Sequence, residues 1–410
     1  MLTIAIRVNH TGRGGDLQET RPLRGVRVLD CATMVAGPLC ATLLGDYGAD
    51  VTKLEQPGKG DPARHFATEK HGEGIYWKSL SRNKKSVALD LHKSDAQNVF
   101  RRWISEFDVL VENFRPGTLE KWNLDPKDLL KRNPRLIVLR MTAFGQSGPY
   151  RDRAGFGTLA EAMSGIAAVS GYEDRTPLLP SLALADTVAA MLAASAVLAA
   201  FIRAKATGRG EVIDCAIYEA AMKLTELQLM AYDQTGRIPA RLGNALEFAA
   251  PRGAFLCSDG QWVALSGSSQ PIAMRFLHAI GGDELANDPR FQTNVDRIQN
   301  GDDLNRKIET WCSLRTRDVV LDTLIPLGCA IGPLESIPSI FENAQVVHNE
   351  SLITVHDATF GPMRMLRPIP EFLNTEPAEI EPGPSAIGMH TAVMLQRDLG
   401  LSAEEIAAIS

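Results

Sequence analysis

The sequence predicts an α/β fold built around a doubly wound, parallel β-sheet. In the first half of the chain, short runs rich in Val, Ile and Leu alternate with segments that carry apolar residues at helical spacing. The segments between successive runs have the length of crossover helices rather than of tight turns. This alternation is typical of parallel βαβ units, in which ligands bind beyond the carboxyl ends of the strands.

The predicted elements follow in order along the chain. Strands are expected at 26–30, 51–55, 86–90, 108–112 and 135–141, with helices at 38–49 and 94–106. Further on, helices are expected at 158–169 and 187–205, and 208–217 leads into another helix near Glu219. Residues 254–257 and 262–266 flank turn residues and predict a β-hairpin. Helical patterns follow at 271–280, 302–312 and 316–326.

Composition and charge narrow the classes of function. With 43 basic and 49 acidic residues, a net charge of -6, the chain lacks the basic field that nucleic-acid binding needs. Six scattered cysteines without a CxxC pair are typical of reduced thiols in a cytoplasmic protein. The eight histidines lack ligand spacing such as HExxH, so we expect no metal. The longest apolar run, Thr187–Ile202, is short and alanine-rich, which favours a buried helix over a membrane span.

Candidate ligand sites follow the predicted strands. After the first strand, Ala36-Gly37-Pro38 opens a helix whose N-terminus could face a phosphate or a thioester. GxGxxG is absent, and an ordinary βα turn would show the same residues. Segments 81–93, 111–122 and 142–150 add basic clusters that could hold phosphates, with Phe114 against an adenine ring. A solvated charged rim is the alternative interpretation of these clusters.

Two further segments could carry chemistry. The loop Ser266–Gln270 could bring backbone N–H groups close to a substrate, although it could equally be a strand-to-helix turn capped by Ser268 or Ser269. Asp186 stands before an apolar helix, where aspartate is a preferred N-cap. The helix dipole should then hold its pKa below the unperturbed value of about 3.9. A persistently ionised carboxylate could also serve as a nucleophile.

Several segments together resemble the family III CoA-transferases, which include formyl-CoA transferase, carnitine CoA-transferase and the related 2-methylacyl-CoA racemase. The resemblance runs from about residue 22 to the end of the chain. It is carried by PLRGVRVLDCATMVAGPLCATLLGDYGADVTKLEQPGKGDPAR, NKKSVALDL, VENFRPGTLEKWNLD, FGQSGPY, ATGRGEVIDCAIYEA, DPRFQTNVDR and HTAVMLQRDLGLSAEEIAAI.

The resemblance implies a large Rossmann-like domain built from both ends of the chain, a smaller α+β domain and an interlocked homodimer. The implied divisions are an N-terminal extension (1–21), the large CoA-binding domain (22–225), a linker (226–245), the small domain (246–350) and a C-terminal return (351–410). No cofactor is expected to be permanently bound, and coenzyme A is part of the substrate. The expected partners are an acyl-CoA donor and a carboxylate acceptor, without nucleic acid or membrane.

The resemblance also assigns site residues. Asp186 matches the aspartate nucleophile, and Ser266, Gly267, Ser268, Ser269 and Gln270 match the loop that covers the aspartyl intermediate. The matching CoA-contact positions are Val35, Ala36, Gln56, Leu89, His92, Asn113, Phe114, Arg115, Lys121, Thr142, Ala143, Phe144 and Gly145. Formyl-CoA transferase has glutamine at Val35, arginine at Gln56 and glycines in the loop, and these differences argue against formyl or oxalyl substrates.

The resemblance therefore implies an acyl-CoA:carboxylate CoA-transferase that works through an aspartyl anhydride and an aspartyl-CoA thioester. The segment GFGTLAEAMSG looks more like the branch that handles dicarboxylates such as succinate, mesaconate, malate or citramalate. Arg64 and Arg252 are possible partners of a distal carboxylate, and transfer between the two carboxyls of one diacid remains open. The alternatives are a 2-methylacyl-CoA racemase, disfavoured because Phe156 stands at the histidine position, and a non-catalytic CoA-binding protein.

Overall fold

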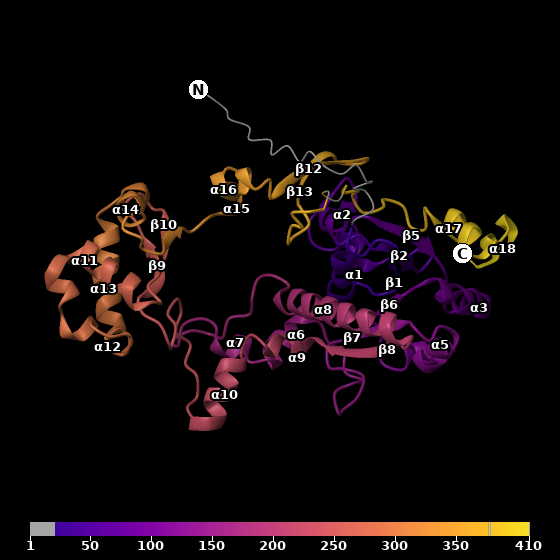
Figure 1. Ribbon diagram of the computed structural model, residues 1–410, viewed down its shortest axis with the longest axis horizontal. Helices are drawn as coiled ribbons and strands as arrows, with labels where there is room; N and C mark the ends of the chain where they lie inside the picture. The colour runs from indigo at the N-terminus through magenta and orange to yellow at the C-terminus, as the bar shows by residue number, and fades with distance from the viewer. Residues whose placement is uncertain (1–20, 376, 378, 410) are drawn as a thin grey trace. The chain divides into compact units, whose positions relative to one another are not determined.

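A six-stranded parallel sheet forms the centre of the first of two compact units (Figure 1). This computed structural model describes residues 21–375, 377 and 379–409, so the predicted extension 1–21 lies outside the described residues apart from Arg21. The first unit contains the described chain up to Ser164, Ser181–Lys223 and the residues from Ser351 onward. The second contains Gly165–Pro180 and Leu224–Glu350.

The strand order in the sheet is β5-β2-β1-β6-β7-β8, and every neighbouring pair is parallel. The chain builds outward from β1 in one direction and then restarts beside it at β6, which is the doubly wound arrangement that the sequence predicts. The five predicted strands are confirmed, and 208–217 contains a sixth. The strands are β1 (Arg27–Asp30), β2 (Asp50–Glu55), β5 (Lys84–Ala88), β6 (Val109–Glu112), β7 (Ile137–Thr142) and β8 (Glu211–Ala216).

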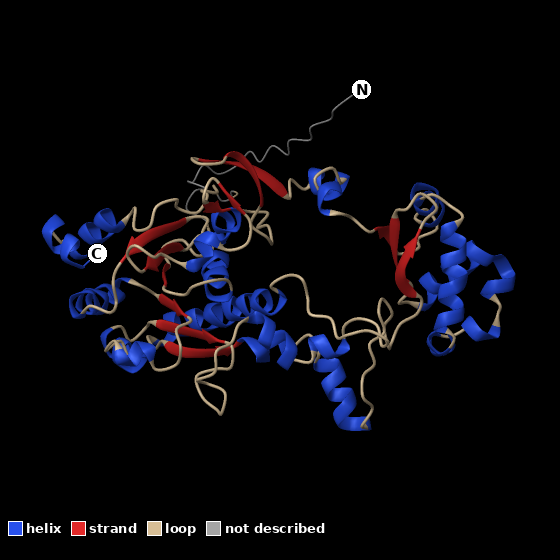
Figure 2. Cartoon of the chain, turned by 180° about the vertical axis from the view of Figure 1, so that it is seen from behind, coloured by secondary structure: helices blue, strands red, loops and turns tan. Residues whose placement is uncertain are grey.

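Alternating side chains of the buried strands face two helical layers. Leu29 and Leu110 belong to a core with Phe100 and Trp103 of α3 (Ser94–Trp103). The C-terminal helices α17 (Thr391–Leu399) and α18 (Ala403–Ile409) complete this core, and α17 packs on β5 and α3 (Figure 1). Both ends of the described chain therefore build one unit. Figure 2 shows the strands of the sheet flanked by helices.

The other layer contains α1 (Ala36–Asp46) and α8 (Leu184–Thr207), which pack against each other. The buried positions of α8 are almost all alanine, and small side chains allow the two helices to approach closely. At 24 residues, α8 is long and apolar enough to cross a membrane by length and composition alone. The run predicted to be too short is thus part of a longer helix. One face of α8 contacts α1, α9 (Ile217–Met222) and the sheet, but only 33% of its apolar window is buried, so the prediction of a buried helix holds only in part.

Shorter elements complete the first unit. They are the helices α2 (Ile75–Leu80), α4 (Thr118–Lys121), α5 (Pro126–Arg132) and α6 (Gly157–Met163), the 3-10 helices Pro62–His65 and Ile104–Glu106, and two hairpins. One hairpin pairs β3 (Glu69–Lys70) with β4 (Glu73–Gly74), and the other pairs β12 (Leu352–Asp357) with β13 (Gly361–Leu366). The sequence did not predict β12 and β13, which lie at the start of the C-terminal return.

The second unit is α+β. The predicted hairpin is confirmed as β9 (Arg252–Leu256) and β10 (Trp262–Ser266), and β11 (Ile331–Pro333) adds a third antiparallel strand. Its remaining elements are α7 (Ile166–Val169), α10 (Glu226–Thr235), α11 (Gln270–Ala286), Pro289–Phe291, α12 (Asn294–Gln299), α13 (Gly301–Ser313), α14 (Arg317–Leu324), α15 (Ile337–Ile340) and α16 (Ala344–His348). The predicted linker 226–245 thus contains a helix, which ends at the left-handed Gly236.

Candidate active site

The restart of the sheet brings two loops together, one after β1 and one after β6. The amide of Thr33 donates to Asn113 Oδ1 at 2.8 Å, and Asn113 Nδ2 donates to the carbonyl of Thr33 at 2.7 Å. One side chain therefore satisfies both backbone groups of Thr33. This fixes the two loops against each other at the edge where ligands bind in doubly wound sheets.

Two cavities open beside these loops, both in the first unit. The first has a volume of about 200 Å³ and contains Asp186, and the second has a volume of about 310 Å³. Thr33 and Phe114 line both cavities. The predicted contact residues at the first cavity are Val35, Ala36, Asn113, Phe114, Arg115, Thr142, Ala143 and Phe144. Those at the second are Gln56, Leu89, His92 and Phe114.

Two predicted contact residues line neither cavity. Lys121 lies at the exposed end of α4. Gly145 has φ +86, and its amide donates to Thr142 Oγ1 at 3.0 Å, so it shapes the turn after β7. Their roles as CoA contacts stay predictions.

Asp186 lies in the first turn of α8 rather than at the N-cap, so the predicted capping role is wrong. The helix begins at Leu184, and its N-cap residue is Ala183, which has no side chain able to cap. The amide of Ala185 instead donates to Oε1 of the buried Glu161 at 3.3 Å. An acceptor from α6 therefore serves the first turn, and the Asp186 carboxylate faces the cavity.

The predicted direction of the Asp186 pKa is also wrong. Burial and, as the smaller cause, the negative charge of Glu161 together raise the pKa of Asp186 from its ordinary value of 3.8 to about 6. These two effects outweigh the stabilisation expected from the helix dipole. Gly157 allows this arrangement, because a Cβ at that position would lie 2.8 Å from Asp186 Oδ2.

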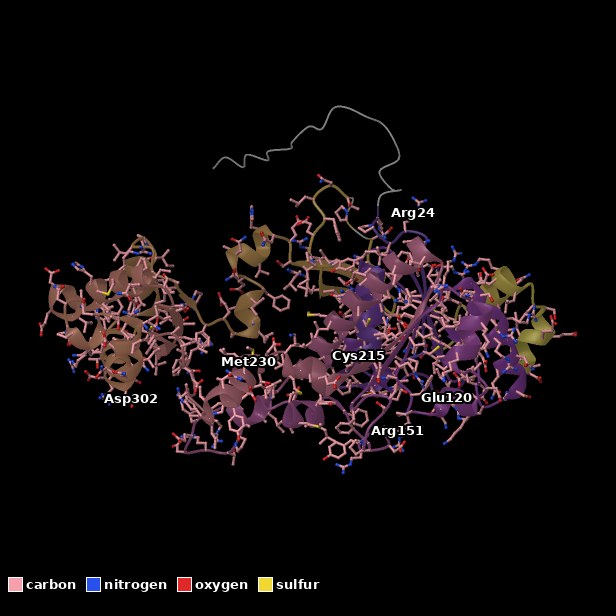
Figure 3. The ribbon with its side chains drawn as sticks, turned by 60° about the horizontal axis from the view of Figure 1, so that its bottom comes forward. Arg24, Glu120, Arg151, Cys215, Met230 and Asp302 are labelled. Atoms are coloured by element: carbon pink, nitrogen blue, oxygen red, sulfur yellow. The ribbon has the colours of Figure 1, made fainter. Side chains whose placement is uncertain are left out.

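Sequence reasoning missed several residues around Asp186 and the two cavities. Tyr76 on α2 is close enough to Asp186 that burial and the charge of Asp186 both raise the pKa of its hydroxyl. Arg151 and Arg153, on the loop between β7 and α6, line the first cavity (Figure 3 labels Arg151). Trp122 lines the second cavity, where its ring packs edge-on against Phe114 and His92. The arginines lie just past the segment 142–150, so extending that segment would have included them.

The two arginines proposed for a distal carboxylate are already bound. Arg64 is buried, and its guanidinium pairs with Glu55 through bonds of 2.7 and 2.8 Å. It also donates to the carbonyls of Pro384 and Ser385. Arg252 belongs to the second unit, where it donates to the carbonyl of Asn244 at 2.8 Å. The interpretation of Arg64 as a substrate ligand is therefore wrong, because its donors hold the C-terminal return in place.

The loop 266–270 belongs to the second unit and joins β10 to α11. The amides of Ser266 and Gly267 donate to the carbonyls of Ala330 and Pro251 at 2.9 and 2.7 Å. Ser269 is the N-cap residue of α11 by position, but its side chain makes no capping bond. Of the loop amides predicted to face an oxyanion, those of Ser266 and Gly267 are therefore already used within the unit.

Comparison with known proteins agrees with this α/β fold and its parallel central sheet. The model of CoA-transferase family III matches residues 23–391, and the chain belongs to this family. The protein is a CoA-transferase. It is 37% identical over 390 residues to succinyl-CoA–D-citramalate CoA-transferase of Chloroflexus aurantiacus. The aligned residues cover 95% of this chain and 97% of the relative.

Two more comparisons span most of the chain. The β subunit of succinyl-CoA–L-malate CoA-transferase from the same organism is 39% identical over 94% of this chain and 96% of its own. A crystal structure of a CaiB/BaiF family protein from Brucella suis is 30% identical and superposes with a TM-score of 0.80, over 92% of this chain and 99% of that one.

Proposed function

We propose that the protein transfers coenzyme A from an acyl-CoA donor to a dicarboxylate acceptor, with Asp186 as the nucleophile. The observation that carries the proposal is the position of Asp186, whose carboxylate lines one cavity with eight residues predicted to contact CoA. The names of these relatives, which include succinyl-CoA with citramalate or malate, support the substrate class.

The proposed reaction passes through covalent intermediates on Asp186. The carboxylate attacks the donor thioester carbonyl, forms a mixed anhydride and releases CoA thiolate. The thiolate attacks the aspartyl carbonyl, releases the donor acid and leaves an aspartyl-CoA thioester. The acceptor carboxylate attacks this thioester and again expels the thiolate, which then attacks the acceptor's carbonyl and regenerates Asp186. Each step exchanges one acyl bond, which is how covalent catalysis divides a difficult transfer.

Several features of the first unit support this chemistry. A pKa of about 6 leaves Asp186 ionised above neutral pH while making it more basic than an exposed aspartate. The N-terminus of α1 at Val35 and Ala36 has no side-chain cap and lines the same cavity, so its positive end can stabilise a developing oxyanion. The aromatic wall of the second cavity, Phe114, Trp122 and His92, suits the adenine end of CoA.

Arg153 is the residue that we propose for the acceptor's distal carboxylate. Its guanidinium lies 3.6 Å from the centre of the Tyr150 ring, which orients its plane. Within the described part of the chain, no carboxylate lies within ion-pair distance of Arg153. The guanidinium can therefore form the bidentate pair that a carboxylate favours.

We also propose the interlocked homodimer as the working assembly. Large apolar side chains are exposed on α8 and around α10, among them Met191, Ile202, Leu227, Met230 and Ile238. A soluble protein rarely leaves so many apolar groups in water, which supports an interface between copies of the chain. Sedimentation at nanomolar concentration should show a dimer, and a folded monomer would contradict this assembly.

Two experiments test the proposed function directly. A panel of acyl-CoA donors and carboxylate acceptors, read by mass spectrometry, should show transfer to C4 and C5 diacids, and activity restricted to short monocarboxylates would contradict the substrate class. Hydroxylamine added during incubation with the donor should convert the acyl-enzyme to a hydroxamate on the peptide that contains Asp186. Label on another residue would refute the assigned nucleophile.

A further inference from the structure

Met34, in the loop between β1 and α1, has a left-handed backbone with φ +66. Residues other than glycine seldom adopt this conformation, and it persists only where the surrounding structure enforces it. The loop lines both cavities: Thr33 contributes to each of them, and Met34, Val35 and Ala36 contribute to the one that contains Asp186.

Side chains rather than neighbouring strands hold this loop. The amide of Met34 donates to Asp61 Oδ1 at 3.0 Å, and the amide of Ala32 donates to Asp30 Oδ1 at 3.1 Å. Lys53 Nζ donates to the carbonyl of Ala32 and pairs with Asp61 Oδ2 at 2.7 Å. All three charged side chains are fully buried, with exposures of 0 to 1%.

The two buried carboxylates favour the charged form of Lys53. Burial alone would favour a neutral amine, but the charges of Asp30 and Asp61 raise the pKa of Lys53 above its ordinary value. Lys84 adds a second cation at 2.9 Å from Asp30. Breaking such a network leaves an uncompensated buried charge, so its geometry resists small displacements.

We infer that Asp61 is a positioning residue that holds Met34 in the left-handed conformation and thereby sets the place of the α1 N-terminus opposite Asp186. The inference rests on the proposed function, because the consequence concerns catalysis at Asp186. Asp61 also caps the short 3-10 helix Pro62–His65 by accepting from the amide of Ala63 at 2.9 Å. A purely local capping role is therefore the alternative that the experiment must exclude.

The positioning role of Asp61 depends on the conformation of Met34, whereas a purely local capping role does not. Glycine adopts positive φ without steric cost, so Met34→Gly removes the need for Asp61 to enforce this conformation. Asp61→Ala should lower kcat/KM by about tenfold to a hundredfold, because a small misplacement of a catalytic group has effects of that size. In an enzyme that already carries Met34→Gly, the same substitution should cost much less. The coupling is read from the double-mutant cycle.

The chain offers a matched control in its second unit. Asp288 precedes Pro289 as Asp61 precedes Pro62, and its carboxylate accepts from the amide of Arg290 at 2.9 Å. Asp288→Ala therefore removes the same kind of cap without touching the loop, and kcat/KM should stay within about twofold of wild type. Circular dichroism and thermal melting of each variant separate misplacement from unfolding.

The outcomes separate this inference from the proposed function. Equal losses from Asp61→Ala in the presence and absence of Met34→Gly would overturn the inference, whereas failure to trap a hydroxamate at Asp186 would overturn the function. If Asp61→Ala does not fold, Asp61→Asn is measured in the same cycle. Asparagine keeps an oxygen that can accept from the amide of Met34, so Asp61→Asn should lower the stability but lower kcat/KM only slightly. A large loss of kcat/KM that is the same with and without Met34→Gly would again overturn the inference.

Discussion

Replacing Asp186 by asparagine should abolish turnover and at the same time stabilise the protein at alkaline pH. The pKa of Asp186 rises from 3.8 to about 6 in the folded state, because burial and Glu161 both disfavour the anion. An acid with a raised folded pKa contributes stability below pH 3.8 and loses it as the pH rises through about 6. At pH 8 the folded state therefore holds an unfavourable charge, which asparagine removes.

The size of the effect follows from the shift. About two pKa units, at about 1.4 kcal/mol each, set an upper limit of about 3 kcal/mol on the stabilisation at pH 8. Partial solvation of the carboxylate and the loss of any favourable dipole interaction reduce this figure, so we expect about 1–2 kcal/mol. The amide has a shape similar to that of the carboxylate, so the packing against Gly157 should change little.

Thermal unfolding at pH 8 and at pH 4, together with turnover at pH 8, measures both effects. The melting temperature of Asp186→Asn should exceed that of the wild type by several degrees at pH 8, and the two should converge at pH 4. Turnover should fall by several orders of magnitude, because an amide cannot attack the thioester. An active variant, or equal melting temperatures at pH 8, would refute the reasoning.

Asp398 supplies a control of the opposite sign. Trp103 Nε1 donates to its carboxylate at 2.7 Å, and Arg397 donates at 2.7 Å. Burial alone would raise the pKa of Asp398, but hydrogen bonds from Arg397, Trp103 and Arg27 lower it to about 2. Its stabilisation is therefore present at neutral pH and is lost as the pH falls towards 2, so Asp398→Asn should lower the melting temperature at pH 8. Activity should persist wherever the variant is folded.

Three further predictions concern the surroundings of Asp186. Glu161→Gln removes a neighbouring negative charge, so the acidic limb of kcat/KM should move below pH about 6, and an unmoved limb would leave Glu161 a structural role only. Arg153→Gln should raise KM for dicarboxylate acceptors and leave KM for monocarboxylates unchanged; equal changes would contradict its assigned role. Gly157→Ala should lower kcat more than it lowers stability, since the new Cβ would displace the Asp186 carboxylate, and a fully active variant would show that the carboxylate tolerates movement.

The sequence predicted the sheet well because its buried strands are continuous apolar runs. β1, β6 and β7 are buried almost throughout, and their short apolar runs favour β-strands over helices or turns. β8 was missed as a strand because it lies at the sheet edge, is only partly buried and contains Glu211 and Asp214. Edge strands carry a weaker pattern, since one side lacks a neighbouring strand and solvent reaches the side chains.

The sequence analysis singled out Asp186, which the structure places at a cavity, but it did not predict the electrostatics around this residue. The place of Asp186 before an apolar helix predicted an N-cap, and its role as nucleophile was implied by the family resemblance. The acceptor for the first turn comes instead from Glu161, whose side chain accepts from the amide of Ala185, 24 residues later in the chain. The prediction for Arg64 as a substrate ligand was wrong for a related reason. Its guanidinium contacts Glu55 and the carbonyls of residues 384–385 only in the folded chain. Spacing along the chain shows charges but not their tertiary partners.

The electrostatics of Asp186 suit the nucleophile that we propose, a carboxylate that must both attack and leave. A pKa near the ordinary aspartate value would give a fully ionised but weakly basic nucleophile, and its anhydride would form slowly. A pKa much above 7 would leave most molecules protonated. At about 6, roughly nine tenths of the carboxylates are ionised at pH 7 and the anion is more basic. Burial and Glu161 thus place Asp186 between two opposing requirements, at the expense of stability that the rest of the unit must supply.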